Sequence, residues 1–382
     1  QIRFMSLPEQ LSEEWQTMPP ETAWSYCNTA YSLLGIIIAN VSGMDYTDYM
    51  EQKILRPMGM SNSCFYLKDE IIPLMANGYN KAKDFEKPRI RDVPAGGLIS
   101  SAEEMSRFLM MTLNEGYVNG NQIISTNMFR EMLKPQNEDI ILDGEFSIGI
   151  TYWLFGQDES AKAAGHSGYI SPYHSMLITI PQSDIALVVV TSSEEGQMAM
   201  TDIALDLMEI FHYPKTGEQF EYKDDPSPVV DYNPEDYSDF LGYYINGFMG
   251  PAELSAKRNK LIFTMMNFPL RVKVHENEEL SLAVKILGIE LNIPVFDDMR
   301  LKLIHHEGSN FIRLSIADVI YDTMMQIEPV EISETWMSRT GDYEILNPDQ
   351  TYFFKHDFEL DYDKKSGFLY LNSSLFGREA NT

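Results

Sequence analysis

Apolar residues in the first part of the chain recur at helical spacing. Residues 29–42 are apolar on nearly every side and end at Gly43, a pattern typical of a deeply buried helix with a glycine stop. Residues 45–55 form a more amphipathic stretch that is expected to end before Pro57, because proline disrupts a helix interior. Two consecutive helices are therefore predicted, the first of them in the core.

A third helix is predicted over residues 100–113. Ser100 or Ser101 can act as its N-cap, since a serine hydroxyl accepts a hydrogen bond from a backbone N–H of the first turn. Glu103 and Glu104 follow in that turn, where negative charge favours the helix dipole. Helices thus dominate this half of the chain.

Two apolar runs after Tyr173 change the period from helix to strand. Residues 174–180 and 185–191 are separated by Pro181-Gln-Ser-Asp184, which predicts two strands joined by a tight turn. Helical spacing returns over 200–211, and the positions expected to lie against the sheet are Ile203, Leu207, Ile210 and Phe211. The fold class predicted for this part is α+β, an antiparallel sheet flanked by helices.

A change of composition near residue 222 marks a domain boundary. Residues 222–236 hold three prolines and five acidic residues with almost no apolar periodicity, as in an extended linker. We therefore expect a first domain over 1–222, a linker over 223–238 and a second domain over 239–382.

Short alternating runs beyond the linker predict an up-and-down β-sheet or small barrel. A weak internal echo joins Leu241-Gly-Tyr-Tyr with Thr340-Gly-Asp-Tyr, each followed by strand-turn-strand material. The second copy is too short to close a barrel of its own. We expect one barrel, with the second copy either partial or completing the first.

Charge and composition narrow the class of partner. The 382 residues carry a formal net charge of -28, which makes tight binding to nucleic acid or anionic lipid unfavourable. No window approaches the ~20 uninterrupted apolar residues of a membrane helix, so no membrane insertion is expected of this chain. Cys27 and Cys64 form neither a disulfide framework nor a metal cluster and are expected to be free thiols. No metal or cofactor is predicted.

Tyr26 and Asn28 stand two positions apart where the chain enters the first predicted helix. In an extended approach both side chains can project to one side. Asparagine offers a donor and an acceptor to a substrate amide, whereas a tyrosine with its ordinary pKa of about 10 needs neighbouring cations to act as a tyrosinate. Alone, the pair favours a helix entry that has no catalytic role.

A second chemical element, Gly165-His166-Ser167-Gly168-Tyr169, directly precedes the strand pair. Glycines on both sides of His-Ser let the backbone approach a substrate closely, and an N–H after the second glycine can serve an oxyanion. Ser167 is not expected to be the nucleophile of an α/β-hydrolase elbow. That motif, G-x-S-x-G, requires glycine where Tyr169 stands, and it requires a helix where this chain predicts a strand.

Three ordered motifs resemble the serine β-lactamase-like superfamily, nearest the class C β-lactamases, penicillin-binding proteins, D-aminopeptidases and related esterases. They are Tyr26-Cys-Asn28, Pro94-Ala-Gly-Gly-Leu-Ile-Ser-Ser-Ala-Glu-Glu-Met and Gly165-His-Ser-Gly168. The resemblance covers residues 7–212 and implies a β-lactamase/transpeptidase-like fold. The tail from residue 239 is similar to the lipocalin-like β domains that some members append, a much weaker match.

The resemblance implies a role for each motif residue. Tyr26 would share proton transfer, Asn28 would orient the substrate amide, and His166 would replace the lysine of the family's Lys-Thr-Gly strand. The substrate and oxyanion residues would be Ser167, Gly168 and Tyr169, with the backbone N–H of the last in the oxyanion hole. The reaction implied is acyl transfer from a small peptide, amide or ester.

The family's nucleophile motif does not occur in this sequence, because no serine has a lysine three positions later. Family order places Ser-x-x-Lys upstream of Tyr26. We expect the nucleophile in an N-terminal portion outside these residues, or in a separate piece of a nicked protein. Association with that fragment is expected, and the 382 residues alone are expected to be inactive.

Two other functions stay open. The chain could be a non-catalytic binding or scaffold protein that kept the fold, with the β tail as its recognition module, or the tail could be a lipocalin-like carrier of apolar ligands. The resemblance favours an extracytoplasmic or cell-envelope location. Substrate identity and oligomeric state are not predicted.

Overall fold

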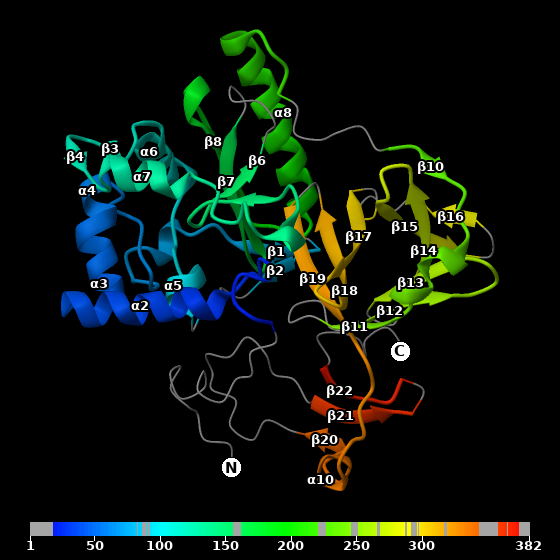
Figure 1. Ribbon diagram of the computed structural model, residues 1–382. Helices are drawn as coiled ribbons and strands as arrows, with labels where there is room; N and C mark the ends of the chain where they lie inside the picture. The colour runs from blue at the N-terminus through cyan, green and yellow to red at the C-terminus, as the bar shows by residue number, and fades with distance from the viewer. Residues whose placement is uncertain are drawn as a thin grey trace. The chain divides into compact units, whose positions relative to one another are not determined.

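The computed structural model describes residues 18–81, 83–85, 90, 92–155, 162–220, 227–245, 251–265, 268–286, 289–291, 296, 298–316, 319–343, 358–364 and 366–373 (Figure 1). The chain forms two compact units. The first consists of 1–21, 27–139 and 145–224; the second consists of 22–26, 140–144 and 225–382. The second unit therefore takes two short segments from the N-terminal half of the sequence.

The first unit combines helices with a central antiparallel sheet. Its helices are α2 Asn28–Ser42, α3 Tyr46–Met50, α4 Arg56–Met58, α5 Val93–Gly96, α6 Ala102–Leu113, α7 Thr126–Met132 and α8 Gly196–Thr216. Short helical turns span Glu51–Leu55, Ile72–Leu74 and Pro181–Ser183. None of the helices that the structure describes is long and apolar enough to cross a membrane.

Five strands make the central sheet, in the order β5-β6-β7-β8-β9. Their bounds are β5 Ser147–Ile148, β6 Trp153–Phe155, β7 Ala163–Ile170, β8 Tyr173–Ile180 and β9 Ile185–Thr191. Two small hairpins lie outside it, β1 Gly78–Asn80 with β2 Lys83–Phe85 and β3 Tyr117–Val118 with β4 Asn121–Gln122. The predicted hairpin is confirmed, because β8 pairs with β9 across the Pro181–Ser183 turn.

Local capping signals set two helix ends as predicted. Helix α2 ends at Gly43, which adopts the left-handed conformation and donates its N–H to the carbonyl of Ala39. Helix α6 begins after Ser101, whose hydroxyl accepts the N–H of Glu104. The prediction that the second helix stops before Pro57 is wrong: helical structure continues to Met58. A wider π-helical turn directly before Pro57 accommodates its ring and its missing N–H.

Helix α2 is not the buried core helix that its composition predicts. Its buried residues are the small Ser32 and Gly35, and a Cβ on Gly35 would lie 2.3 Å from the Pro94 ring. Several of the larger side chains face away, with Leu34 50% and Val41 84% exposed. Tight packing of α5 therefore selects the small-residue face, and an all-round apolar sequence does not indicate which face that is.

Helix α8 lies on the sheet, but with a different face from the one predicted. Its buried residues, spaced four apart, are Met200, Ala204, Met208 and His212. Ala204 and Met208 pack with Ile178 and Ile185 of the sheet. The predicted contact positions Ile203, Ile210 and Phe211 are instead 48% to 61% exposed. Both stripes have helical spacing, so only the packing against β8 and β9 distinguishes them.

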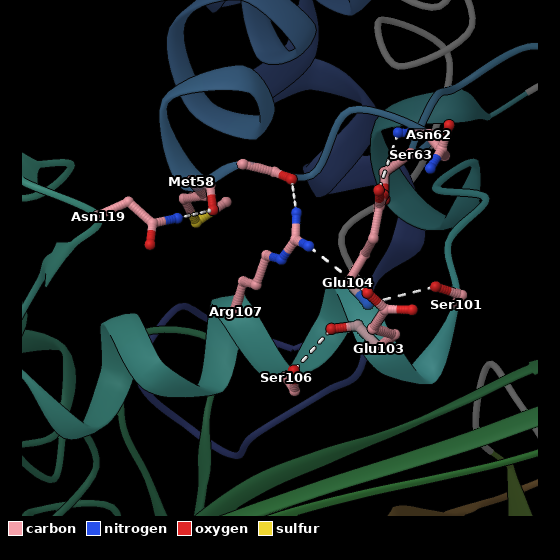
Figure 2. A network of polar contacts seen from close by, with 10 residues as sticks. Met58, Asn62, Ser63, Ser101, Glu103, Glu104, Ser106, Arg107 and Asn119 are labelled. Carbon is pink, nitrogen blue, oxygen red and sulfur yellow. Dashed lines mark hydrogen bonds and ion pairs between the residues drawn. The ribbon is translucent and has the colours of Figure 1, made fainter.

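A buried carboxylate ties the start of α6 to the segment before it (Figure 2). Glu104 is 4% exposed; it accepts the Asn62 N–H at 2.9 Å and the Ser63 hydroxyl at 2.5 Å. The Ser63 hydroxyl lies 2.8 Å from that of Ser100. Next to them Cys64 and Ile99 exchange both backbone hydrogen bonds. The Pro94–Met105 motif is therefore a structural junction around Glu104.

The second unit is built on an up-and-down barrel. Its strands are β11 Gly242–Ile245, β12 Ala252–Ala256, β13 Leu261–Met265, β14 Phe268–His275, β15 Leu280–Ile286, β17 Met299–His306, β18 Ser309–Ile316 and β19 Val319–Ile327. Successive strands pair antiparallel, and β19 pairs back with β11, which closes a ring of eight strands. Strand β16, Ile289–Leu291, extends β15 as a hairpin.

Side chains of the barrel strands fill its interior. One continuous buried cluster runs through the ring; it includes Tyr244, Leu254, Phe263, Val272, Leu282, Leu301, Ile312, Leu314 and Met324. Alternate residues of each strand supply it, as the pleat requires. A ring of eight strands is just wide enough for such filling. The barrel is therefore a packed core.

The described part of the predicted linker is built onto the barrel. Strand β10, Val229–Val230, pairs with β14, and a short helix spans Pro234–Phe240 after its Asn233 cap. Tyr232 packs against the barrel core. Residues 223–226 of the prediction lie outside the described residues. The pairing of β10 explains why a proline-rich, acidic stretch is not an extended connection here.

The C-terminal echo forms a sheet of its own. Strands β20 Gly341–Tyr343, β21 Phe358–Asp363 and β22 Phe368–Ser373 pair antiparallel after the short helix α10, Glu334–Met337. Tyr243 of β11 contacts the ring of Phe368 edge-on at 5.2 Å. Among the described residues, this second β unit is a small three-stranded sheet separate from the barrel.

Candidate active site

Strand β7 carries the Gly165-His166-Ser167-Gly168-Tyr169 element along the middle of the sheet. On one side β8 pairs with it over its whole length from Ala164 to Ile170. On the other side β6 pairs only as far as Gly165. In the described part of the chain, the pairing of β6 with β7 therefore ends at Gly165 and leaves the rest of that edge open.

This open edge has the properties of a peptide-binding strand. Residues change from buried to exposed along β7, and Gly168 and Tyr169 are exposed. Unpaired backbone groups of an edge strand are ready donors and acceptors for an extended ligand. The open stretch coincides with the residues predicted to bind substrate and oxyanion. An added strand or a carbonyl oxygen could bind there.

A side chain at Gly165 and one at Gly168 would meet different parts of β8. A Cβ on Gly165 would lie 2.5 Å from the backbone oxygen of Leu177, so the approach of β8 excludes any side chain. A Cβ on Gly168 would meet only the Ser175 hydroxyl, at 2.6 Å. Gly165 is therefore required by the sheet itself, whereas Gly168 keeps an exposed part of the strand narrow.

His166 is held against an aromatic ring that sequence patterns did not indicate. Its imidazole stacks on Trp153 of β6, with centroids 4.5 Å apart and planes inclined by 21°. Nδ1 lies within hydrogen-bond distance of the Ser167 carbonyl, so the proton is assigned to that nitrogen. Burial lowers the pKa of His166, and the bond to Ser167 opposes this in part. The imidazole is therefore uncharged at neutral pH, and it offers a polar, uncharged surface where the family's lysine would carry a positive charge.

Tyr169 is anchored through its side chain at the end of the strand. Its hydroxyl donates to the Glu194 carboxylate, which also accepts the Ser171 hydroxyl at 2.8 Å. The Tyr169 ring stacks on buried His174, with centroids 4.6 Å apart. These contacts hold the backbone of the exposed end of β7 in place. Glu194 lies three residues after the end of strand β9, and that position is a sequence signal that could have identified it.

Tyr26 and Asn28 lie at the entry of α2, as predicted. Asn28 is the first residue of the helix and is exposed, and the thiol of Cys27 accepts the Ala30 N–H at 3.4 Å as a weak cap. Tyr26 is 43% exposed. Burial raises its pKa, so Tyr26 is a phenol at neutral pH and not a standing tyrosinate. Tyr26 belongs to the second unit, whereas Asn28 and His166 belong to the first.

Histidine and carboxylate groups do not gather into a metal site among the described residues. The chemistry available on β7 and at the α2 entry is that of hydrogen-bond donors, an amide, a phenol and a neutral imidazole. Such groups can orient a carbonyl compound and relay a proton.

The unfolding free energy is expected to fall as the pH drops below about 6.5, the ordinary histidine pKa. Burial lowers the pKa of His174, partly opposed by Glu194, and it lowers the pKa of His166. Between these lowered values and the ordinary one, the unfolded chain binds more protons than the folded chain. Stability is therefore fully present above the ordinary value and is lost progressively below it.

Urea unfolding at two pH values on either side of that window measures this loss. His174→Phe keeps the ring stacked on Tyr169 but cannot be protonated. We expect this variant to lose part of the pH dependence of the wild type. Equal pH dependence in the two proteins would contradict the assignment to His174.

Comparison with known proteins gives a family model and several relatives. A family model described as Beta-lactamase matches residues 4–208. Beta-lactamase-like protein 2 of Dictyostelium discoideum is 28% identical over 187 residues, which are 47% of this chain and 33% of that protein. Penicillin-binding protein 4 of Amycolatopsis lactamdurans is 25% identical over 228 residues, 56% of this chain and 59% of that protein. The chain thus spans between a third and three fifths of the length of these two relatives.

Solved structures share the fold over both units. The crystal structure of SurE covers 84% of this chain and 72% of its own, at 18% identity and a TM-score of 0.64. A structure of SurE with D-Leu has a TM-score of 0.62 at 17% identity, covering 84% of this chain and 72% of that chain.

Proposed function

The chain belongs to the Beta-lactamase family, and from this we propose that it carries part of the active site of a serine hydrolase that cleaves an amide or ester through an acyl-enzyme. The family model identifies the family, and the chain has its α+β, β-lactamase/transpeptidase-like fold. The observation that supports the proposed reaction is the open edge of β7, where the family's substrate-binding motif continues beyond Gly165, the last residue that pairs with β6.

In the proposed reaction a serine hydroxyl attacks the substrate carbonyl carbon, and the carbonyl oxygen becomes an oxyanion. The N–H of Tyr169 stabilises that oxyanion, and the amide of Asn28 holds the substrate. The bond to the leaving group then breaks, and the leaving nitrogen or oxygen takes a proton. Water attacks the resulting ester of the enzyme serine and releases the acid.

Tyr26 relays the proton in this scheme. Its phenol, the form present at neutral pH, gives its own proton to the leaving group and receives the serine proton in exchange. His166 takes the place of the family lysine as a neutral side chain that can hydrogen-bond to the substrate. A neutral ring attracts a substrate carboxylate less than a lysine does, which favours neutral amides or esters over strongly anionic substrates.

The serine nucleophile, in this proposal, belongs to a Ser-x-x-Lys motif outside residues 1–382. We propose that the segment bearing it packs on the exposed apolar face of α2. Leu34, Ile37 and Val41 form that face and are at least half exposed. Burying such a face on a partner segment is favourable, at about 25 cal/mol for each Å² removed from water.

The test compares the 382-residue chain with the same chain supplied with its Ser-x-x-Lys segment. A fluorophosphonate and a penicillin probe, followed by intact mass, report a covalent adduct, and a D-leucine ester reports turnover. We expect neither adduct nor turnover from the chain alone and a single serine adduct from the supplied protein. Ester turnover by the chain alone, or no adduct in the supplied protein, would refute the proposal.

Absence of an adduct would favour the alternative, a binding or scaffold protein that kept the fold. The barrel is compatible with a lipocalin-like region. We propose a structural role for it rather than a carrier role, because apolar side chains of its own strands occupy the interior.

A further inference from the structure

We propose that the barrel unit positions Tyr26 through Arg313 and Asp143, so that these two residues are positioning residues of the hydrolase. The catalytic part of this inference rests on the proposed role of Tyr26 in proton transfer. The contacts that carry it all lie within the second compact unit.

The first contact lies on the outer face of the barrel. Ile312 and Leu314 point into the barrel core, so Arg313 between them points outward. Its Nη1 donates to the Leu142 carbonyl at 3.3 Å, which joins residues 171 positions apart. Thr323, opposite Arg313 in the strand register, is buried although it is on the same outer face. The outer face of the barrel around Arg313 and Thr323 is therefore covered by other residues.

Gly144 shows how closely the segment 140–144 fits on Arg313. Its φ of +59° and ψ of -124° are favoured by glycine. A Cβ there would lie 2.0 Å from Nη1 and 2.9 Å from Cζ of Arg313. Both the backbone conformation and the guanidinium therefore exclude a side chain. The segment 140–144 packs so closely on Arg313 that a Cβ at Gly144 would disrupt the contact.

Asp143 continues the connection towards the site. It is 0% exposed, and its Oδ1 accepts the Trp24 N–H at 2.7 Å across 119 positions of sequence. A carboxylate acceptor makes a strong hydrogen bond with a backbone donor, more so away from water. The short segment Thr22–Tyr26 is therefore fastened at Trp24, two residues before the candidate catalytic tyrosine.

The last step is from Trp24 to Tyr26. Their ring centroids are 6.1 Å apart with planes inclined by 57°, a contact in the range of favourable aromatic pairs. Arg313 thus holds the 140–144 segment, and Asp143 of that segment holds Trp24. The Trp24 indole in turn contacts the Tyr26 phenol ring. Tyr26 takes its orientation from the barrel unit and not from helix α2 alone.

The test uses the 382-residue chain with tyrosines labelled at ¹³Cζ, and Tyr26→Phe assigns the Tyr26 signal. Burial raises the Tyr26 pKa in the wild type. In Asp143→Ala and Arg313→Met we expect this pKa to move down towards its ordinary value, because the phenol gains water. Hydrogen exchange of the Trp24 amide should become about tenfold faster in both variants.

Two further variants separate positioning from general loss of structure. Asp143→Asn keeps an oxygen acceptor for the Trp24 N–H and should restore slow exchange. Lys302 lies opposite Arg313 in the register of β17 and β18, yet bonds to the Asn277 carbonyl. Lys302→Met should therefore leave the Tyr26 pKa and the Trp24 exchange unchanged. If Asp143→Ala does not fold, Arg313→Met decides alone.

An unchanged Tyr26 pKa together with unchanged Trp24 exchange in Arg313→Met would overturn the inference. A Tyr26 shift in Lys302→Met equal to that in Arg313→Met would overturn it too. These readouts require no catalysis, so they stand apart from the probe-labelling result. Positioning can thus be confirmed while the proposed hydrolysis fails, and the reverse.

Discussion

Replacing Tyr26 with phenylalanine in the hydrolase supplied with its Ser-x-x-Lys segment is expected to slow acylation by about 100- to 10,000-fold, the usual worth of a general acid-base group. The Tyr26 phenol can pass a proton, whereas the Asn28 amide cannot. Because burial raises the Tyr26 pKa, the wild-type rate should fall at alkaline pH where the phenol ionises. The variant should lack that alkaline limb.

The measurement is the rate constant of ester turnover across pH, with penicillin-probe labelling as a second readout, because the leaving group of each takes a proton. Tyr31→Phe is the matched control: this tyrosine lies on α2 and is 38% exposed, close to the exposure of Tyr26. The control should keep the wild-type rate and pH profile. If Tyr26→Phe labels as fast as Tyr31→Phe, Tyr26 has no part in proton transfer.

Replacing Glu104 with alanine is expected to lower the unfolding free energy by about 2–4 kcal/mol. The substitution removes a buried carboxylate, so the Asn62 N–H loses its acceptor and the buried Ser63 hydroxyl loses its carboxylate partner (Figure 2). Ser100 can compensate only the second of these, because its hydroxyl already lies beside Ser63. Glu104→Gln keeps one oxygen acceptor and should cost less.

Urea unfolding measures the loss, and Glu103→Ala is the control one residue earlier. The Glu103 side chain is 84% exposed and pairs with Arg107 at 3.5 Å, so its loss should change the unfolding free energy by less than about 1 kcal/mol. Cys64 gives a second readout. Its buried thiol neighbours Ser63, and it should be alkylated faster in Glu104→Ala. Equal stability of the two variants would refute the role of the network.

Elements with local signals were predicted correctly from sequence. The C-terminal stop of α2 at Gly43 and the Ser101 cap of α6 depend on residues within one helical turn. The β8–β9 hairpin depends on two apolar runs and the turn between them. Each is set by neighbours in sequence, which is why periodicity and capping chemistry suffice.

The site residues divide in the same way. The sequence places His166 and Tyr169 on one strand directly before the hairpin, and that position is observed. Their partners were not predictable: Trp153 stacks on His166, and Glu194 anchors Tyr169. These partners come from neighbouring strands or from the end of β9, so the register of the sheet determines them.

By itself the sequence determined the family resemblance, the α+β pattern and the helix ends, because each depends on residue type and short-range spacing. Only the tertiary structure decided which faces of α2 and α8 are buried, since an apolar stripe has no direction until a partner packs on it. The same holds for Tyr26. Its segment joins the barrel unit through Asp143 and Arg313, and a contact between residues more than a hundred positions apart has no local signature.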